Sequence, residues 1–510
     1  MIRKSLTILL LSCSLTSIAA VPPRDPNRWD EWQRQIALQK EADKQYALHP
    51  DMAHMPAATQ KSVARTPIPR ILVIMANFAD FELTSTREDV DSMFNAQNWT
   101  KDDAKGSVRQ YFYDQSMGEY NPQFDVVGPV TLSQGYVYYG PNGNGTVGCM
   151  VTEACRLVDD EVDFSLYDAN DDGLVDLVYV LYAGFGRNDP PKVASLLPTI
   201  SGDLIWPAYW NVASAGFCNN QRVFDGKTVH ACEYSNELDG YYCTEDKRVV
   251  SGIGIVCHEF SHAIGLPDLY ATGDAHYKKL LGGWDIMCNG PYNDDMHSPP
   301  SYSAYERFFM GWLTPTLITE PDTLSLEHIA TSNQAYLISE NDRHNLDGLH
   351  PDTAVFYLLE NRQKTGWDRG LQGSGMLLTR VNFHEAWWTG KVVNNNPDDL
   401  GVDIIEADGN ATASIKSTVG YWGKPGDAFP YGATEYTGIP DHAITDITMN
   451  DGVITFVYRG GKTATPVYPI MTDDSEPCTR SKAYKIIRNG QLLIHSNGHT
   501  YSVMGICQDN

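Results

Sequence analysis

Residues 256–270 of this chain are VCHEFSHAIGLPDLY, and they contain the pattern HExxH at residues 258–262. On an α-helix, residues four apart share a face, so His258 and His262 can direct ring nitrogens at one cation. Glu259 lies beside them, where its carboxylate can take a proton from a metal-bound water and later deliver it to a leaving amine. The stretch therefore predicts a helix that carries two zinc ligands and a general base.

The end of the same stretch predicts a third ligand. Gly265 and Pro267 indicate that the helix stops soon after His262. A continued helix would carry Asp268 about 9 Å along the axis and off the histidine face. A glycine at positive φ can instead turn the chain back, so that Asp268 approaches the metal and the fourth position is left to water. The alternatives for Asp268 are a surface carboxylate or a hydrogen-bond partner of a histidine.

A tract some twenty residues later extends the pattern. HEFSHAIGLPD is followed by Gly-Trp-Asp-Ile-Met at residues 283–287. Together they resemble the immune inhibitor A family of secreted bacterial metallopeptidases, which belongs to the metzincins. The resemblance covers residues 69–460, is strongest over residues 168–313, and implies a metzincin-like α+β zinc peptidase domain. It also implies that Met287 forms an apolar floor beneath the zinc site.

Two features of the site stay open at the level of sequence. A metallopeptidase of another class would take its third ligand from a glutamate on a later helix, and Glu306 is the obvious candidate. A tyrosine after Met287 could help to stabilise an oxyanion, but the sequence does not choose between Tyr292, Tyr302 and Tyr305.

Residues 168–176, DANDDGLVD, form a second motif. Oxygen-bearing side chains stand at alternate positions, and a glycine stands where a calcium loop must bend sharply. Position twelve of the loop is Tyr179 and not the bidentate glutamate of an EF-hand, so the motif is not an EF-hand. The motif predicts a structural calcium site at the start of a buried strand, and a solvated Asx-rich turn is the alternative. The expected chelators are the side chains of Asp168, Asn170, Asp172 and Asp176 and the backbone carbonyl of Leu174.

The first twenty residues have the anatomy of a signal peptide: a basic start, an apolar centre and small residues up to Ala20. Cleavage near Ala20 is expected, and the alternative is a lipobox that would lipidate Cys13. No other stretch approaches the length of a transmembrane helix. We therefore expect a secreted or cell-surface protein.

The charge balance limits the partners. With 38 basic and 64 acidic residues the formal net charge is -26, which argues against nucleic acid or an anionic membrane as the ligand. Nine cysteines follow the signal segment, and disulfides are plausible in an exported protein. A pair between Cys257 and Cys288 is possible, but connectivity does not follow from sequence. The absence of any CxxC pair argues against a cysteine-ligated zinc site.

Changes in composition predict six segments. After residue 315 short alternating strands separated by Gly, Asn, Asp and Pro clusters indicate an all-β, sandwich-like domain. Within it, Glu360 and Glu406 are structural ion-pair partners or, alternatively, calcium ligands. The predicted segments are a signal peptide (1–20), a pro-segment or linker (21–68), a zinc peptidase domain (69–315), a β-rich domain (316–460), a linker (461–477) and a C-terminal β tail (478–510).

Two of these segments suggest further roles. The pro-segment could cover the zinc site before activation, with His49, Asp51 or His54 as a ligand. The tail resembles the C-terminal sorting tails of type IX secretion substrates, which implies the secretion machinery as a partner. A last edge hairpin, possibly closed by Cys478 and Cys507, is the alternative.

Together these patterns predict a secreted zinc metalloendopeptidase that hydrolyses protein or peptide substrates, with Glu259 as the base. The competing hypothesis is a catalytically silent surface adhesin or glycan-binding protein, stabilised by calcium, on a metallopeptidase scaffold. Intact His258, Glu259 and His262 weigh against it, because a binding module does not need the base.

Overall fold

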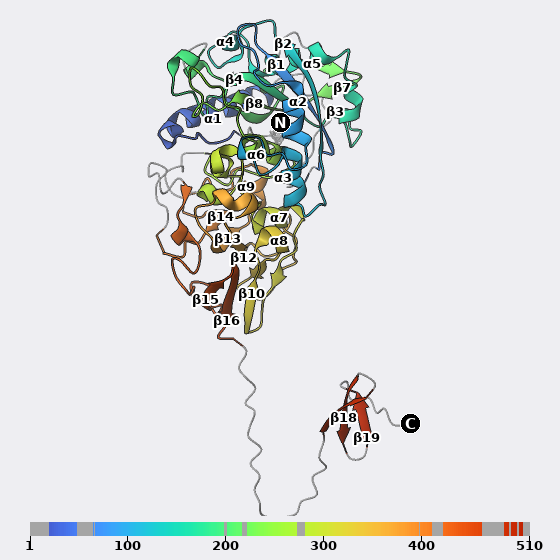
Figure 1. Ribbon diagram of the computed structural model, residues 1–510, viewed down its shortest axis with the longest axis vertical. Coiled ribbons are helices and arrows are strands. Elements are labelled where there is room, and N and C mark those ends of the chain that lie inside the picture. The colour runs from blue at the N-terminus through green and yellow to red at the C-terminus, as the bar shows by residue number, and fades with distance from the viewer. Residues whose placement is uncertain are drawn as a thin grey trace, which may run out of the picture. The chain divides into compact units, whose positions relative to one another are not determined.

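The computed structural model forms two compact units, residues 1–462 and 463–510, and each is described by itself (Figure 1). The described residues are 20–47, 65, 67–197, 201–216, 222–272, 281–396, 398–410, 422–461, 484–488, 491–496 and 499–502.

A five-stranded sheet in the order β2-β1-β4-β8-β5 forms the centre of the peptidase part. Its first four strands are parallel and β5 is an antiparallel edge strand. The interior strands are buried along their length, as expected for apolar runs in a sheet that is covered on both faces. The strands are β1 (Arg70–Asn77), β2 (Gln123–Thr131), β4 (Val178–Phe185), β5 (Ala208–Asn211) and β8 (Ala231–Leu238).

Helices connect and cover these strands, because parallel strands need crossover connections. α5 packs against β1, β2 and β4, while α2 packs against β2. The helices of this part are α1 (Trp29–Ala47), α2 (Arg87–Asn95), α3 (Val108–Gln115), α4 (Tyr136–Tyr139), α5 (Val147–Val158), α6 (Gly254–Ala263) and α7 (Ala304–Met310).

α6 carries the HExxH pattern and is buried at every residue. It packs against β5 and β8, and also against α3. The ring of Phe260 contacts Phe112 and Phe124 at centroid distances of 4.9 and 5.4 Å. This apolar contact fixes the helix to the sheet and leaves the histidine side free for the site.

Two further sheets follow α7. One has the order β14-β13-β12-β11-β9 and the other β10-β16-β15. The strands are β9 (Thr316–Leu317), β10 (Asp322–Leu326), β11 (Tyr336–Ile338), β12 (Val355–Arg362), β13 (Gly375–Asn382), β14 (Val402–Ile404), β15 (Ile444–Asn450) and β16 (Val453–Tyr458).

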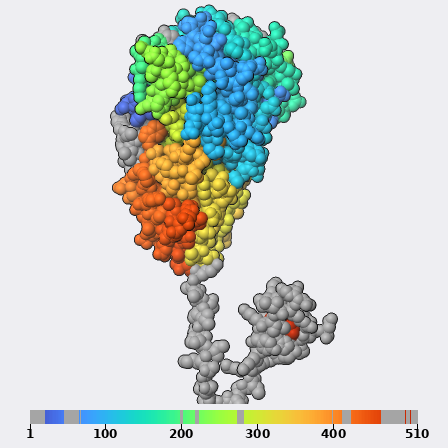
Figure 2. Space-filling view, viewed as in Figure 1, coloured from blue at the N-terminus to red at the C-terminus, as the bar shows by residue number. Residues whose placement is uncertain are grey.

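The larger downstream sheet shares the main core with the peptidase part. In β12, Phe356 and Leu358 belong to the core of the peptidase part, whereas Tyr357 and Leu359 face a second apolar cluster shared with β15 and β16. The region also contains two short helices, α8 (Ile329–Ser332) and α9 (Glu385–Thr389). Figure 2 shows the downstream residues, orange to red, in continuous contact with the rest of this unit.

A small sheet of β3 (Leu174–Val175), β6 (Val223–Phe224) and β7 (Lys227–Val229) lies beside the acidic loop. In the second unit, β17 (Tyr484–Arg488), β18 (Gln491–Ser496) and β19 (His499–Ser502) form an antiparallel three-stranded sheet. Among the described residues, no helix is both long and apolar enough to span a membrane.

Candidate active site

The two histidines of α6 face each other with their Nε2 atoms 3.2 Å apart. Nδ1 of His258 donates to the carbonyl of Ile286 at 2.7 Å, and Nδ1 of His262 donates to the carbonyl of Leu266 at 2.8 Å. A carbonyl can only accept, so each neutral ring carries its proton on Nδ1 and presents a lone pair on Nε2. Two buried lone pairs at this separation are the arrangement that a shared cation stabilises.

Asp268 completes the group. Its Oδ1 lies 3.0 Å from Nε2 of His262 and 3.5 Å from Nε2 of His258, and no donor satisfies this buried oxygen. Gly265, at φ 123°, supplies the turn that brings it there. Burial opposes ionisation of Asp268, but the two histidines outweigh it and lower its pKa.

This donor set fits a catalytic zinc ion. In the part of the chain that the structure describes, these three residues are the only group of three or more His, Cys, Asp or Glu whose ligand atoms converge, all lying within 4.8 Å of one another. Two imidazole nitrogens and one carboxylate oxygen are ligands that catalytic zinc takes while keeping one position open.

The tract around Met287 holds the site from a second side. The carbonyl of Ile286 orients His258, and the carbonyl of Met287 accepts from the backbone N–H of Leu269 at 2.9 Å. The Met287 side chain is fully buried. The tract thus fixes both His258 and the segment that carries Asp268, as supporting groups around metal ligands do.

Glu259 points into the same centre. Its Oε2 accepts from the backbone N–H of Tyr209 on β5, and its Oε1 accepts from the backbone N–H of Val21, both at 2.8 Å. Burial raises the pKa of this carboxyl to about 8. The carboxylate is therefore presented directly to a peptide N–H.

Tyr270 is the residue that the sequence interpretation missed. Its ring stacks on His258 at a centroid distance of 6.4 Å, and its hydroxyl donates to the carbonyl of Ala20 at 2.6 Å. Its place two residues after Asp268, beyond the glycine turn, is the signal that could have identified it. The three tyrosines considered earlier have other partners: Tyr292 donates to Pro22, Tyr302 meets Ser261, and Tyr305 accepts from Trp388.

Glu306 lies outside the metal group. It forms a capping box at the start of α7, with its carboxylate on the backbone N–H of Ser303 at 2.6 Å. Glu360 forms a buried ion pair with Arg362 at 3.2 Å. Both glutamates thus have structural partners.

Comparison with known proteins agrees with this geometry. Residues 79–312 match the family model described as the catalytic domain of immune inhibitor A peptidase M6. The match covers just under half of the chain. Immune inhibitor A of Bacillus thuringiensis subsp. alesti is 22% identical over 280 residues, which cover 47% of this chain and 39% of that protein. Pre-pro-metalloprotease PrtV of Vibrio cholerae serotype O1 is 21% identical over 315 residues, which cover 53% of this chain and 32% of that protein. The chain thus spans about a third of the latter relative, and the shared part is a metallopeptidase domain.

The segment before the matched domain runs through the candidate site. Besides the contacts to Glu259 and Tyr270, Trp206 donates to the carbonyl of Val21 at 2.9 Å. Trp32 of α1 donates to the carbonyl of Ala20 at 3.2 Å. The predicted covering residues His49, Asp51 and His54 lie outside the described residues.

The predicted calcium loop is held by internal contacts. Asp168 binds the ammonium of Lys227 at 2.7 Å and accepts from the backbone N–H of Gly173. Asp176 accepts from the N–H of Ala169, and Asp172 from that of Leu174. Asn170 accepts from the N–H of Asp172. Calcium binding here stays a prediction.

The cysteines of the domain divide into two groups. Cys149 forms a disulfide, and Cys155, Cys232, Cys243, Cys257 and Cys288 are buried free thiols. The suggested pair between Cys257 and Cys288 is therefore wrong. Buried thiols in apolar surroundings behave as small core residues.

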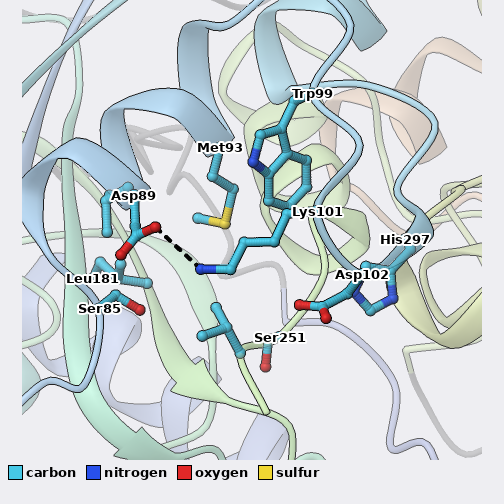
Figure 3. Close-up of a pocket in the computed structure, with 11 residues that line it drawn as sticks. Ser85, Asp89, Met93, Trp99, Lys101, Asp102, Leu181, Ser251 and His297 are labelled. Carbon is cyan, nitrogen blue, oxygen red and sulfur yellow. Dashed lines mark hydrogen bonds and ion pairs between the residues drawn. The ribbon is translucent and has the colours of Figure 1, made fainter.

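A small pocket elsewhere in the domain is distinct from the active site. Figure 3 shows it between Trp99, Met93 and Ser251, with Lys101 bound to Asp89 at 3.2 Å. The pocket has a volume of about 10 Å³, which is enough for roughly one water molecule. Its lining contains none of the metal-binding candidates.

Proposed function

We propose that this protein is a secreted zinc-dependent endopeptidase in which His258, His262 and Asp268 hold the metal. When bound, zinc would polarise the scissile carbonyl and acidify a water molecule. The convergence of three buried ligand atoms, with both histidine Nδ1 atoms committed to carbonyls, supports this assignment.

One pair of contacts in the uncleaved chain supports the catalytic roles proposed for Glu259 and Tyr270. The peptide unit between Ala20 and Val21 has its N–H on Glu259 and its carbonyl on the hydroxyl of Tyr270. A substrate peptide bond in this place would meet the same two groups. Glu259 takes the proton of the attacking water and passes it to the leaving nitrogen, while Tyr270 donates to the carbonyl oxygen as negative charge develops. Met287 and its tract keep the ligands in position.

The remaining expectations belong to the same proposal. A signal peptide would export the protein, and the Ala20–Val21 unit in the cleft is intact only before its cleavage near Ala20. Calcium would stabilise the loop of residues 168–176, and the tail would engage a secretion machinery. No feature of the described residues favours the adhesin hypothesis.

Hydrolysis of denatured casein tests the proposal, after removal of residues 21–68. The Glu259→Gln variant keeps the size of the side chain and removes the base, so we expect a loss of activity of about 10²–10⁴-fold. A zinc chelator should abolish wild-type activity, and added zinc should restore it. Chelator-resistant activity, or a Glu259→Gln variant as active as the wild type, would refute the proposed function.

A further inference from the structure

Arg24 of the N-terminal segment fills a pocket of three carboxylates next to the active site. Its guanidinium lies 3.0 Å from a carboxylate oxygen of each of Asp189, Asp239 and Asp295. The Arg24 side chain is only 11% exposed, and those of Asp189 and Asp239 are 8% and 0% exposed. A simple ion pair needs one carboxylate for each cation. Here three carboxylates surround one guanidinium, so the pocket carries an excess of negative charge.

The walls of this pocket suit a flat cationic group. The guanidinium carbon lies 4.7 Å from the ring centre of Tyr241 and 5.5 Å from that of Tyr242, within the range of cation–π attraction. Asp239 is fixed by the backbone N–H groups of both tyrosines. The peptidase part itself thus holds Asp239 in position.

The backbone path links the pocket to the catalytic centre. The N–H of Val21 binds Glu259, the carbonyl of Pro22 accepts from Tyr292 at 2.6 Å, and the N–H of Arg24 binds the carbonyl of Asn188 at 3.1 Å. Arg24 lies three residues from Val21, so an extended chain separates the pocket from the base by about 10 Å. A peptide in the cleft would therefore reach both places at once.

We propose that Asp189, Asp239 and Asp295 form a subsite for a basic side chain. In the latent chain Arg24 fills it and anchors the blocking segment; after that segment leaves, an arginine or lysine of the substrate takes its place. The proposal rests on the peptidase function proposed above and specifies the substrate class of that site.

The energetics favour a cation over a neutral side chain. Departure of Arg24 leaves three neighbouring carboxylates without a counter-charge, and like charges held close together repel one another. Burial already raises the pKa of Asp189 to about 6 in the presence of Arg24. An incoming guanidinium or ammonium removes this repulsion. Tyr242 and Asp295 also line an adjoining cavity of about 350 Å³, which gives a substrate side chain room to enter.

One side of the blocking segment borders a cavity, while Trp29, Trp32 and Ile36 are buried in the main core. A cavity of about 280 Å³ lies between α1, which contributes Gln35, Leu38, Gln39 and Ala42, and a wall that includes Trp206 and Trp210. Incomplete packing on this side lowers the cost of releasing α1. Arg24 thus acts together with the buried apolar contacts in holding the segment.

The first arm of the test uses the full-length chain. We expect Arg24→Ala to raise the rate of casein hydrolysis at least tenfold over the wild type, since the segment loses its anchor. Arg34→Ala removes an exposed arginine of the same segment and should stay as latent as the wild type. An Arg24→Ala chain that remains latent would overturn the anchoring role.

The second arm measures binding, which needs no turnover and so separates this proposal from the proposed function. Fluorescence anisotropy compares two labelled peptides, Ala-Val-Pro-Pro-Arg and Ala-Val-Pro-Pro-Ala, on the Arg24→Ala chain. We expect the arginine peptide to bind at least tenfold more tightly, and the difference to vanish in Arg24→Ala chains that also carry Asp189→Asn or the half-exposed Asp295→Asn. Equal binding of the two peptides would overturn the subsite even if the chain is an active peptidase.

Discussion

Replacement of Tyr270 by phenylalanine separates catalysis from construction of the site. The hydroxyl donates to the carbonyl of Ala20 at 2.6 Å, and the ring stacks on His258 independently of that hydroxyl. Phenylalanine keeps the ring and loses only the donor. Removal of one such donor typically costs about 2.7–4 kcal/mol, or about 10²–10³ in kcat.

The stability of the Tyr270→Phe variant should change little. Each lost hydrogen bond costs about 0.5–1.5 kcal/mol. The substitution also removes the interaction of the hydroxyl with Asp268, but it leaves the ligand atoms of His258, His262 and Asp268 in the chain. We therefore expect zinc content to stay at the wild-type level and KM to change less than kcat. The assay is the steady-state hydrolysis of a quenched fluorescent peptide after removal of residues 21–68.

Tyr302→Phe is the matched control. Tyr302 is also fully buried and its hydroxyl meets Ser261 of α6, away from the peptide unit at Ala20. It should lose a similar amount of stability and keep kcat within about twofold, because its hydroxyl contacts no substrate group. If kcat of Tyr270→Phe falls no further than that of Tyr302→Phe, Tyr270 does not stabilise the transition state.

Three other perturbations follow from the same contacts. Gly265→Ala places a side chain on a residue at φ 123°, which costs about 1–3 kcal/mol of backbone strain. We expect weaker zinc affinity in a competition titration. Unchanged affinity would mean that the turn does not place Asp268. Arg362→Met leaves the carboxylates of Asp368 and Glu360 unpaired and should lower the free energy of unfolding by about 3–5 kcal/mol in urea; a loss below 1 kcal/mol would contradict the buried network. Millimolar calcium should raise the melting temperature of the wild type by about 2–4 °C and leave that of Asp172→Ala unchanged. If neither melting temperature rises, the loop does not bind calcium and Lys227 is the cation that neutralises it.

The metal-binding candidates could be predicted because they depend on local geometry. The four-residue spacing of His258 and His262 needs only one helical turn. The return of Asp268 needs only Gly265, whose positive φ is encoded by the absence of a side chain. Both features lie within eleven residues of sequence, and the capping box that engages the alternative ligand Glu306 is equally local.

Contacts between distant segments could not be predicted in this way. Val21 and Glu259 form a hydrogen bond although they lie 238 residues apart in the sequence, and Arg24 and Asp239 do so at a separation of 215 residues. No periodicity or spacing in the sequence predicts such pairs. The sequence suggested that the segment covers the site, but it pointed to histidines and an aspartate further along.

The two-sided burial of β12 could not be predicted for a related reason. The run VFYLLENR of β12 reads as an isolated strand of a new domain, yet it is buried on both faces. One face completes the core of the peptidase part. Through Arg362, which donates to the carbonyl of Trp284 at 3.2 Å, this strand also supports the tract that holds His258. The downstream sheet is thus part of the structure that positions the site.

The zinc content of purified full-length chains tests the central claim most directly. Elemental analysis after dialysis should find one zinc per chain in the wild type and in Glu306→Ala, and almost none in Asp268→Ala, with circular dichroism confirming that each variant is folded. Zinc that survives the loss of Asp268 and disappears with the loss of Glu306 would contradict the assignment of the site.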